Sequence, residues 1–104
     1  MWKVRRQMIR TREVKSRVIE LKINPKFFVP VATERKQFEI RKNDRDYMIG
    51  DTLMLREYSN KEYTGRMVAA VVTYITDYAQ RDGYVVLGII KVYRPEAWFK
   101  AVMK

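Results

Sequence analysis

The run of residues 84–92, which reads YVVLGIIKV, constrains the fold more than any other stretch of this chain. It is nearly all apolar and rich in β-branched residues, a composition typical of a strand buried on both faces. Glycine inside a strand marks a bulge or a close approach of another backbone, and Gly88 occupies such a position. The run therefore predicts the central strand of a closed sheet.

Four further stretches have strand character. Residues 66–76 are long and apolar on both faces, whereas residues 17–23 alternate between an apolar face, apart from Val18, and a polar face. Residues 38–41 and 52–56 predict two more half-buried strands, and residues 58–65 and 77–83 predict turns between strands. Five short strands predict a mainly β protein with some helix (α+β), a small barrel rather than an open sheet, because closure removes exposed edges.

Two helices are expected. Asn24 can cap a helix that has Pro25 at its first position, and Pro30 should keep this helix short. Its buried stripe is expected to contain Phe27, Phe28, Val31 and Ala32. Residues 95–103 predict a short terminal helix in which Trp98 and Val102 lie one turn apart.

Composition excludes several classes of protein. The 104 residues suffice for one compact domain, and no apolar run is long enough to span a bilayer. The basic N-terminus has no apolar segment behind it, so it does not resemble a signal peptide, and a cytoplasmic location is expected. With no cysteine and no histidine, disulfides, zinc sites and Cys/His or Ser/His catalytic pairs are excluded. No cofactor is predicted.

The net charge of +10 is unevenly placed. Residues 1–22 contain eight basic and two acidic residues, so a basic arm (residues 1–16) is expected to precede a single domain (residues 17–104). Such a distribution of charge is typical of a protein that binds a phosphate-rich partner. Plain solubility charge and a tail added for expression remain alternatives, and no membrane partner is expected.

The segment of residues 36–57 is the candidate site region. Ten mostly polar residues separate its two strands, more than a hairpin needs, and a long charged loop on a rigid sheet is a common binding element. A merely solvated loop is the alternative. Its carboxylates, Asp44, Asp46 and Asp51, alternate with Lys42 and Arg45, so a metal site is not predicted.

Three charged residues form a sharper pattern just before this loop. Glu39 and Arg41 share one face of an extended strand, and Lys36 precedes them at the helix exit. A carboxylate between two cations can bind the edge of a base, although a surface ion-pair cluster would show the same spacing. Among the aromatic residues, Tyr47 and Tyr78 lie beside loops and are candidates for base stacking.

Residues 34–41, ERKQFEIR, resemble the G-x-K-x-x-E-x-R signature of ASCH domains, which belong to the PUA-like superfamily. The wider stretch of residues 19–90 is similar to a small ASCH-like subfamily found in bacteria and their phages. The resemblance implies a PUA-like β-barrel with a helix beside a cleft that binds RNA or modified nucleosides. Lys36, Glu39 and Arg41 match the Lys, Glu and Arg of the signature.

Three positions depart from the ASCH pattern. Glu34 replaces the signature's Gly, so the helix exit loses its usual left-handed residue, and Ile19 replaces a usual His. Some ASCH relatives are amidohydrolases of acetylated cytidine that use a lysine with a nearby threonine. Lys36 matches that lysine, but Glu39 occupies the place of the threonine, so the resemblance does not extend to this activity.

The preferred expectation is a non-catalytic module that binds nucleic acid, with RNA as the preferred partner. A small amidohydrolase with Lys36 as base or nucleophile and Glu39 assisting is one alternative, and a protein-interaction module using the arm and Trp98 is another. The oligomeric state is left open by the sequence. The residues expected to bind nucleic acid are Lys22, Lys36, Glu39, Arg41, Lys42, Asn43, Arg45 and Tyr47.

Overall fold

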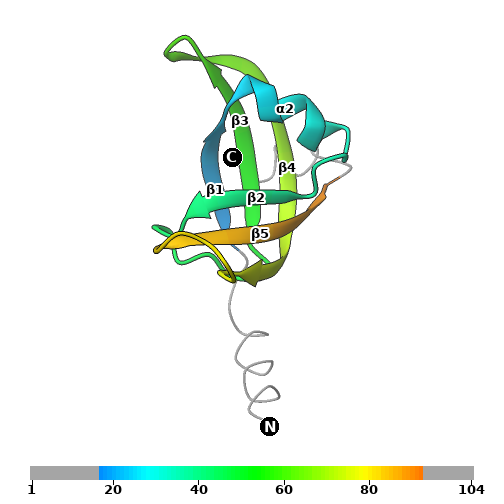
Figure 1. The fold of residues 1–104 in the computed structure, drawn as a ribbon. Helices are drawn as coiled ribbons and strands as arrows, with labels where there is room; N and C mark the ends of the chain where they lie inside the picture. The colour runs from blue at the N-terminus through cyan, green and yellow to red at the C-terminus, as the bar shows by residue number, and fades with distance from the viewer. Residues whose placement is uncertain (1–16, 93–104) are drawn as a thin grey trace, which may run out of the picture.

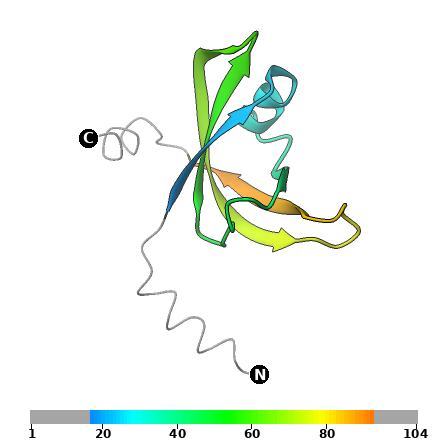
Figure 2. The same ribbon diagram turned by 90° about the vertical axis from the view of Figure 1, so that its left-hand side faces the viewer.

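A computed structural model describes residues 17–92, which form one five-stranded sheet and one helix (Figure 1). The expected arm and terminal helix lie outside these residues. The sheet order is β1-β3-β4-β5-β2, and the sheet curls into a half-barrel with α2 on its concave side (Figure 2). The mainly β class, the five strands and the first helix are thus confirmed. The elements are β1 (Val18–Ile23), α2 (Pro25–Ala32), β2 (Phe38–Lys42), β3 (Thr52–Ser59), β4 (Glu62–Thr76) and β5 (Tyr84–Lys91).

The sheet curls about β4, which is its central strand. The first part of β4 pairs with β3 and its last part pairs with β5, with a register shift between Val72 and Tyr74. The prediction that residues 84–92 form the central strand is therefore wrong: β5 lies between β4 and β2. Its inner face is buried, but Ile90 on its outer face is 56% exposed, so an apolar run did not require burial on both faces.

Gly88 permits a close approach between β5 and β4. It pairs with Tyr74, and a Cβ built at residue 88 would lie 3.2 Å from the Tyr74 Cβ. Because that separation is tighter than ordinary Cβ contacts, the absent side chain lets the two strands stay in register beside the bulge. The predicted close approach at Gly88 is confirmed.

The core fills the concave face of the half-barrel. β1 alternates as expected, with its odd-numbered residues buried, and α2 adds Phe28 and Val31. The side chain of Asn24 accepts a hydrogen bond from Lys26 N at 2.9 Å and so caps the helix. The core cluster comprises Ile19, Leu21, Ile23, Phe28, Val31, Tyr47, Leu53, Leu55, Val68, Ala70, Val72, Val85, Leu87 and Ile89.

Phe27 does not belong to this core, contrary to the prediction. It is 40% exposed, because a helix of about two turns resting on a sheet buries a narrow stripe and adjacent residues diverge by about 100°. At the helix exit, Glu34 has φ of 66°. The chain therefore keeps a left-handed residue there although the glycine of the ASCH signature is absent.

β2 alternates, with its apolar face turned outward. Phe38 and Ile40 are 41% and 52% exposed, whereas Glu39 is 4% exposed. The pairing Glu39 with Leu87 places the carboxylate on the same face as the core of β5. Alternation in the sequence thus established which residues share a face, but not which face is buried.

The predicted turn at residues 77–83 is confirmed, because β4 ends at Thr76 and β5 begins at Tyr84. The predicted turn at residues 58–65 is much shorter than expected. β3 and β4 form a hairpin whose turn contains only Asn60 and Lys61, with φ of 53° and 67°, because the expected turn region continues both strands. β2 and β3 are not neighbours, so the nine-residue segment between them crosses the end of the half-barrel. Within residues 17–92, no helix combines the length and the hydropathy needed to cross a membrane.

Candidate nucleic-acid interface

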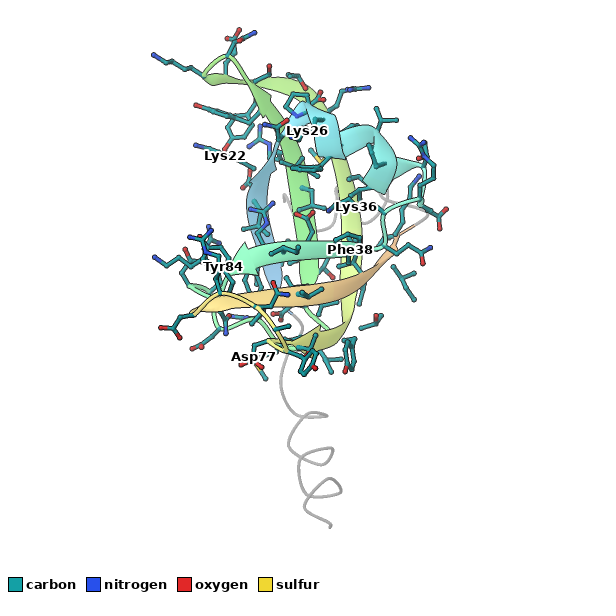
Figure 3. All side chains as sticks on the ribbon, in the orientation of Figure 1. Lys22, Lys26, Lys36, Phe38, Asp77 and Tyr84 are labelled. Atoms are coloured by element: carbon teal, nitrogen blue, oxygen red, sulfur yellow. The ribbon has the colours of Figure 1, made fainter. Side chains whose placement is uncertain are left out.

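The two edges of the half-barrel, β1 and β2, face one another without pairing in the sheet. The side chain of Arg41 spans this opening and donates from Nη2 to the main-chain oxygen of Lys22 at 2.8 Å. Figure 3 shows Lys22 beside β1 and Lys36 above the start of β2, with Phe38 at that end of β2 and Tyr84 near the other end. Two hollows adjoin the bridge, and both are lined by Lys22, Arg41 and Lys42.

Glu39 lies at the centre of the predicted trio. Its Oε1 accepts from Lys36 Nζ at 2.7 Å, and its Oε2 accepts from Arg41 Nη2 at 2.8 Å and Nε at 3.1 Å. Lys36 Nζ also donates to the main-chain oxygen of Phe38 at 2.7 Å. The structure therefore brings Lys36, Glu39 and Arg41 together, with the lysine acting as a hydrogen-bond donor and the buried carboxylate holding both cations in place.

The smaller hollow, of about 560 Å³, has an aromatic wall. Lys36 Nζ lies 4.6 Å from the ring centroid of Phe38 and 5.2 Å from that of Phe27. Both rings are about two-fifths exposed, so they present apolar surface next to the ammonium group. The residues lining this hollow are Lys22, Ile23, Asn24, Phe27, Lys36, Phe38, Glu39, Ile40, Arg41, Lys42 and Tyr84.

The larger hollow, of about 640 Å³, is mainly cationic. Arg56 forms an ion pair with Glu20 and lies 3.8 Å from the ring centroid of Tyr63, while Lys22 Nζ lies 4.2 Å from that of Tyr58. Five basic and two acidic residues line it, so its charge is positive. The lining residues are Glu20, Leu21, Lys22, Arg41, Lys42, Asp44, Arg45, Tyr47, Arg56 and Tyr63.

Two of the predicted binding residues have other roles in this structure. Tyr47 is 7% exposed and belongs to the core, and burial raises the pKa of its hydroxyl. The side-chain oxygen of Asn43 accepts from Tyr47 N at 3.2 Å and so shapes the loop. The stacking candidate Tyr78 is 84% exposed but lines neither hollow. The other six predicted residues all line one or both hollows.

The charged loop of residues 43–51 is held by Arg17 and Asp51. Arg17 donates to both oxygens of Asp51, at 3.1 and 2.7 Å, and to the main-chain oxygen of Asp46 at 2.8 Å. Asp51 is 3% exposed and also accepts from Met48 N. Among residues 17–92, no group of three or more side chains converges as metal ligands. The loop is a fixed rim of the larger hollow.

Sequence reasoning missed several residues of these hollows, among them Phe27, Arg56 and Tyr63. Phe27 was assigned to the core, and nothing local marked the other two. Arg56 pairs in register with Lys22 through a parallel ladder between β1 and β3, which are separated by a helix and a strand. Only knowledge of that long-range pairing could have grouped these cations.

A second buried carboxylate lies away from the hollows. Glu57, 3% exposed, accepts from Arg66 Nε and Nη2 at 2.9 Å each and from the hydroxyl of Thr64 at 2.7 Å. These bonds lower the pKa of Glu57 to about 2. The Arg66 guanidinium also lies 4.6 Å from the ring centroid of Phe28, so this cluster joins the hairpin to α2.

Comparisons with known proteins give a family and a similar phage protein. The model of the family described as domain of unknown function DUF3850 matches residues 18–89, which include the whole of the described sheet except its last strand positions. The chain belongs to this family. It is also 40% identical over 73 residues to the "Uncharacterized 12.9 kDa protein in GpA 3'region" of Escherichia phage P2, covering 69% of this chain and 67% of the phage protein.

Proposed function

We propose that this protein is a non-catalytic module that binds single-stranded RNA across the two hollows. The observation that carries the proposal is that both hollows share Lys22, Arg41 and Lys42. A strand can therefore place a base in the aromatic hollow and adjacent phosphates in the cationic hollow. Aromatic surface combined with a positively charged groove is the common arrangement for binding single strands.

Electrostatics support the same partner. The larger hollow has an excess of basic residues, and the chain as a whole has a net charge of +10. Arg45 and Lys42 are exposed at its rim, where their charges are available to phosphate groups. Among residues 17–92, in contrast, Glu39 accepts from Lys36 and Arg41 alone, so its proposed role is to position these cations and not to contact a base directly.

The proposal includes the fold family. We infer that the half-barrel is a PUA-like domain of the ASCH type. The support is the convergence of Lys36, Glu39 and Arg41, which match the ASCH signature, in a cleft that has α2 beside it. In this arrangement the signature residues form one side of the opening between β1 and β2.

Salt dependence of binding tests the proposal. Binding of a fluorescent single-stranded RNA, measured by anisotropy, should weaken steeply with salt, with a log–log slope of roughly −0.7 per phosphate contacted. Lys42→Gln and Arg45→Gln should each reduce the magnitude of this slope by about 0.7. The matched control is Lys61→Gln, because Lys61 is exposed at the hairpin tip and lines neither hollow. Absence of binding at low salt, or equal effects of all three substitutions, would overturn the proposal.

A further inference from the structure

Main-chain hydrogen bonds at both ends of β2 reveal which of its residues face β5. Ile89 N donates to Gln37 O at 3.1 Å, and Asn43 N donates to Gly83 O at 2.8 Å. Both bonds fit the register of the antiparallel β2–β5 ladder. Hydrogen-bonded pairs alternate with non-bonded pairs in such a ladder. The odd-numbered residues of β2 therefore bond across to β5.

The even-numbered residues of β2 turn their main-chain groups to the open edge. The carbonyl of Phe38 accepts from Lys36 Nζ at 2.7 Å, and the carbonyl of Lys42 accepts from Asp44 N at 2.8 Å. Ile40 lies between them. Within residues 17–92, neither its N–H nor its C=O has a hydrogen-bond partner. One residue of the edge thus presents an open donor beside an open acceptor.

This open pair faces the smaller hollow. On the opposite edge, Thr52 N donates to Arg17 O at 2.8 Å, which places the odd-numbered residues of β1 toward β3 and the carbonyl of Lys22 toward the opening. The guanidinium of Arg41 donates a hydrogen bond to that carbonyl. The hollow between the edges is lined by Ile40 together with the rings of Phe27 and Phe38.

We propose that the main-chain N–H and C=O of Ile40 bind the hydrogen-bonding edge of one unpaired nucleobase. The inference rests on the proposed RNA-binding function and assigns the base-contacting group within that site. In an extended residue the two groups point the same way, and every Watson–Crick edge offers a donor next to an acceptor. Contact through main chain, with aromatic surface beside it, accepts a base with little preference for its identity.

Amide hydrogen exchange tests this on the unmodified protein. In the free protein, the Ile40 amide should exchange much faster than the amides of Glu39 and Arg41, which bond to β5. A single-stranded oligouridylate should slow exchange at Ile40 by at least about tenfold and leave the two neighbours unchanged. An abasic oligomer of the same length should bind through its phosphates without protecting Ile40. Equal protection by both oligomers, or none by the oligouridylate when it is bound, would overturn the inference.

Substitution provides a second test. Ile40→Pro removes the edge N–H but no ladder bond, since proline is tolerated where the N–H faces away from the sheet. It should weaken oligouridylate binding by about tenfold. Ile40→Ala, which keeps the N–H and removes only side-chain atoms, should weaken binding much less than Ile40→Pro does, because the Ile40 side chain is half exposed. If Ile40→Pro binds normally while Lys42→Gln still reduces the salt slope, the inference fails and the proposed function stands.

Discussion

Two buried glutamates, Glu39 and Glu57, are each bound by cations, and the two clusters differ in the exposure and further contacts of those cations. Glu57 is bound by Arg66 and Thr64 on the same hairpin, and the Arg66 side chain is 56% exposed. Glu39 is bound by Lys36 and Arg41, whose side chains are only 16% and 23% exposed. Arg41 further joins β2 to β1 through the carbonyl of Lys22.

This difference separates a structural ion pair from one that prepares a site. Arg66 lines neither hollow, and its guanidinium lies over the core residue Phe28. Lys36 and Arg41 line the hollow between the sheet edges. The cations of the Glu39 cluster thus adjoin a space that a ligand can enter, whereas the Arg66 side chain packs over Phe28 and joins the hairpin to α2.

The largest difference is expected from truncating the two carboxylates. Glu39→Ala should lower the free energy of unfolding by about 3 kcal/mol, because it leaves two largely covered cations without their counter-ion. Glu57→Ala should cost less, since the exposed Arg66 side chain can be hydrated. Urea unfolding of both variants measures the order. A larger loss for Glu57→Ala would contradict the distinction drawn between the clusters.

Acidification tests the Glu57 cluster without removing its side chain. The Glu57 pKa of about 2 lies below the ordinary value of 4.5, so this carboxylate binds a proton less readily in the folded state than in the unfolded chain. The resulting stability is complete above pH 4.5 and is lost as the pH falls toward about 2. Thermal unfolding followed across this window should show a shallower decline in Glu57→Gln than in the unmodified protein. Parallel curves would show that the carboxylate gains nothing from Arg66.

The smallest effect on stability is expected from Arg41→Lys, which keeps the positive charge but loses the hydrogen-bonding geometry of the guanidinium. Arg41→Lys cannot make all three bonds of the guanidinium, so unfolding should become easier by about 1 kcal/mol. RNA affinity, measured by anisotropy, should fall in Arg41→Lys and stay unchanged in Arg66→Lys. Equal affinities for the two variants would remove the functional distinction between the clusters.

Local chemistry made much of the fold predictable. Asn24 and Pro25 marked the helix start, alternation in residues 18–23 marked β1, and Gly88 marked a close strand contact. The trio of Lys36, Glu39 and Arg41 was also anticipated, since its members lie within six residues of sequence. Each of these features depends on neighbours in the chain, which the sequence displays directly.

Pairing between distant strands was not predictable in this way. The order of the sheet, the central place of β4 and the parallel ladder that brings Arg56 beside Lys22 depend on contacts between segments far apart in the chain. The burial of Tyr47 and the exposure of Phe27 follow from how α2 and the charged loop rest on the sheet. None of these contacts leaves a local signal.

The sequence by itself determined the types of the elements and the chemistry available to them, because propensity, capping and alternation act over a few residues. Only the tertiary structure decided that the polar face of β2 turns inward, since that choice depends on which strand lies beside it. The same packing leaves two sheet edges facing each other across Arg41. The candidate site is this opening. Its unpaired main-chain groups result from the way the strands pair, so no residue type in the sequence marks them.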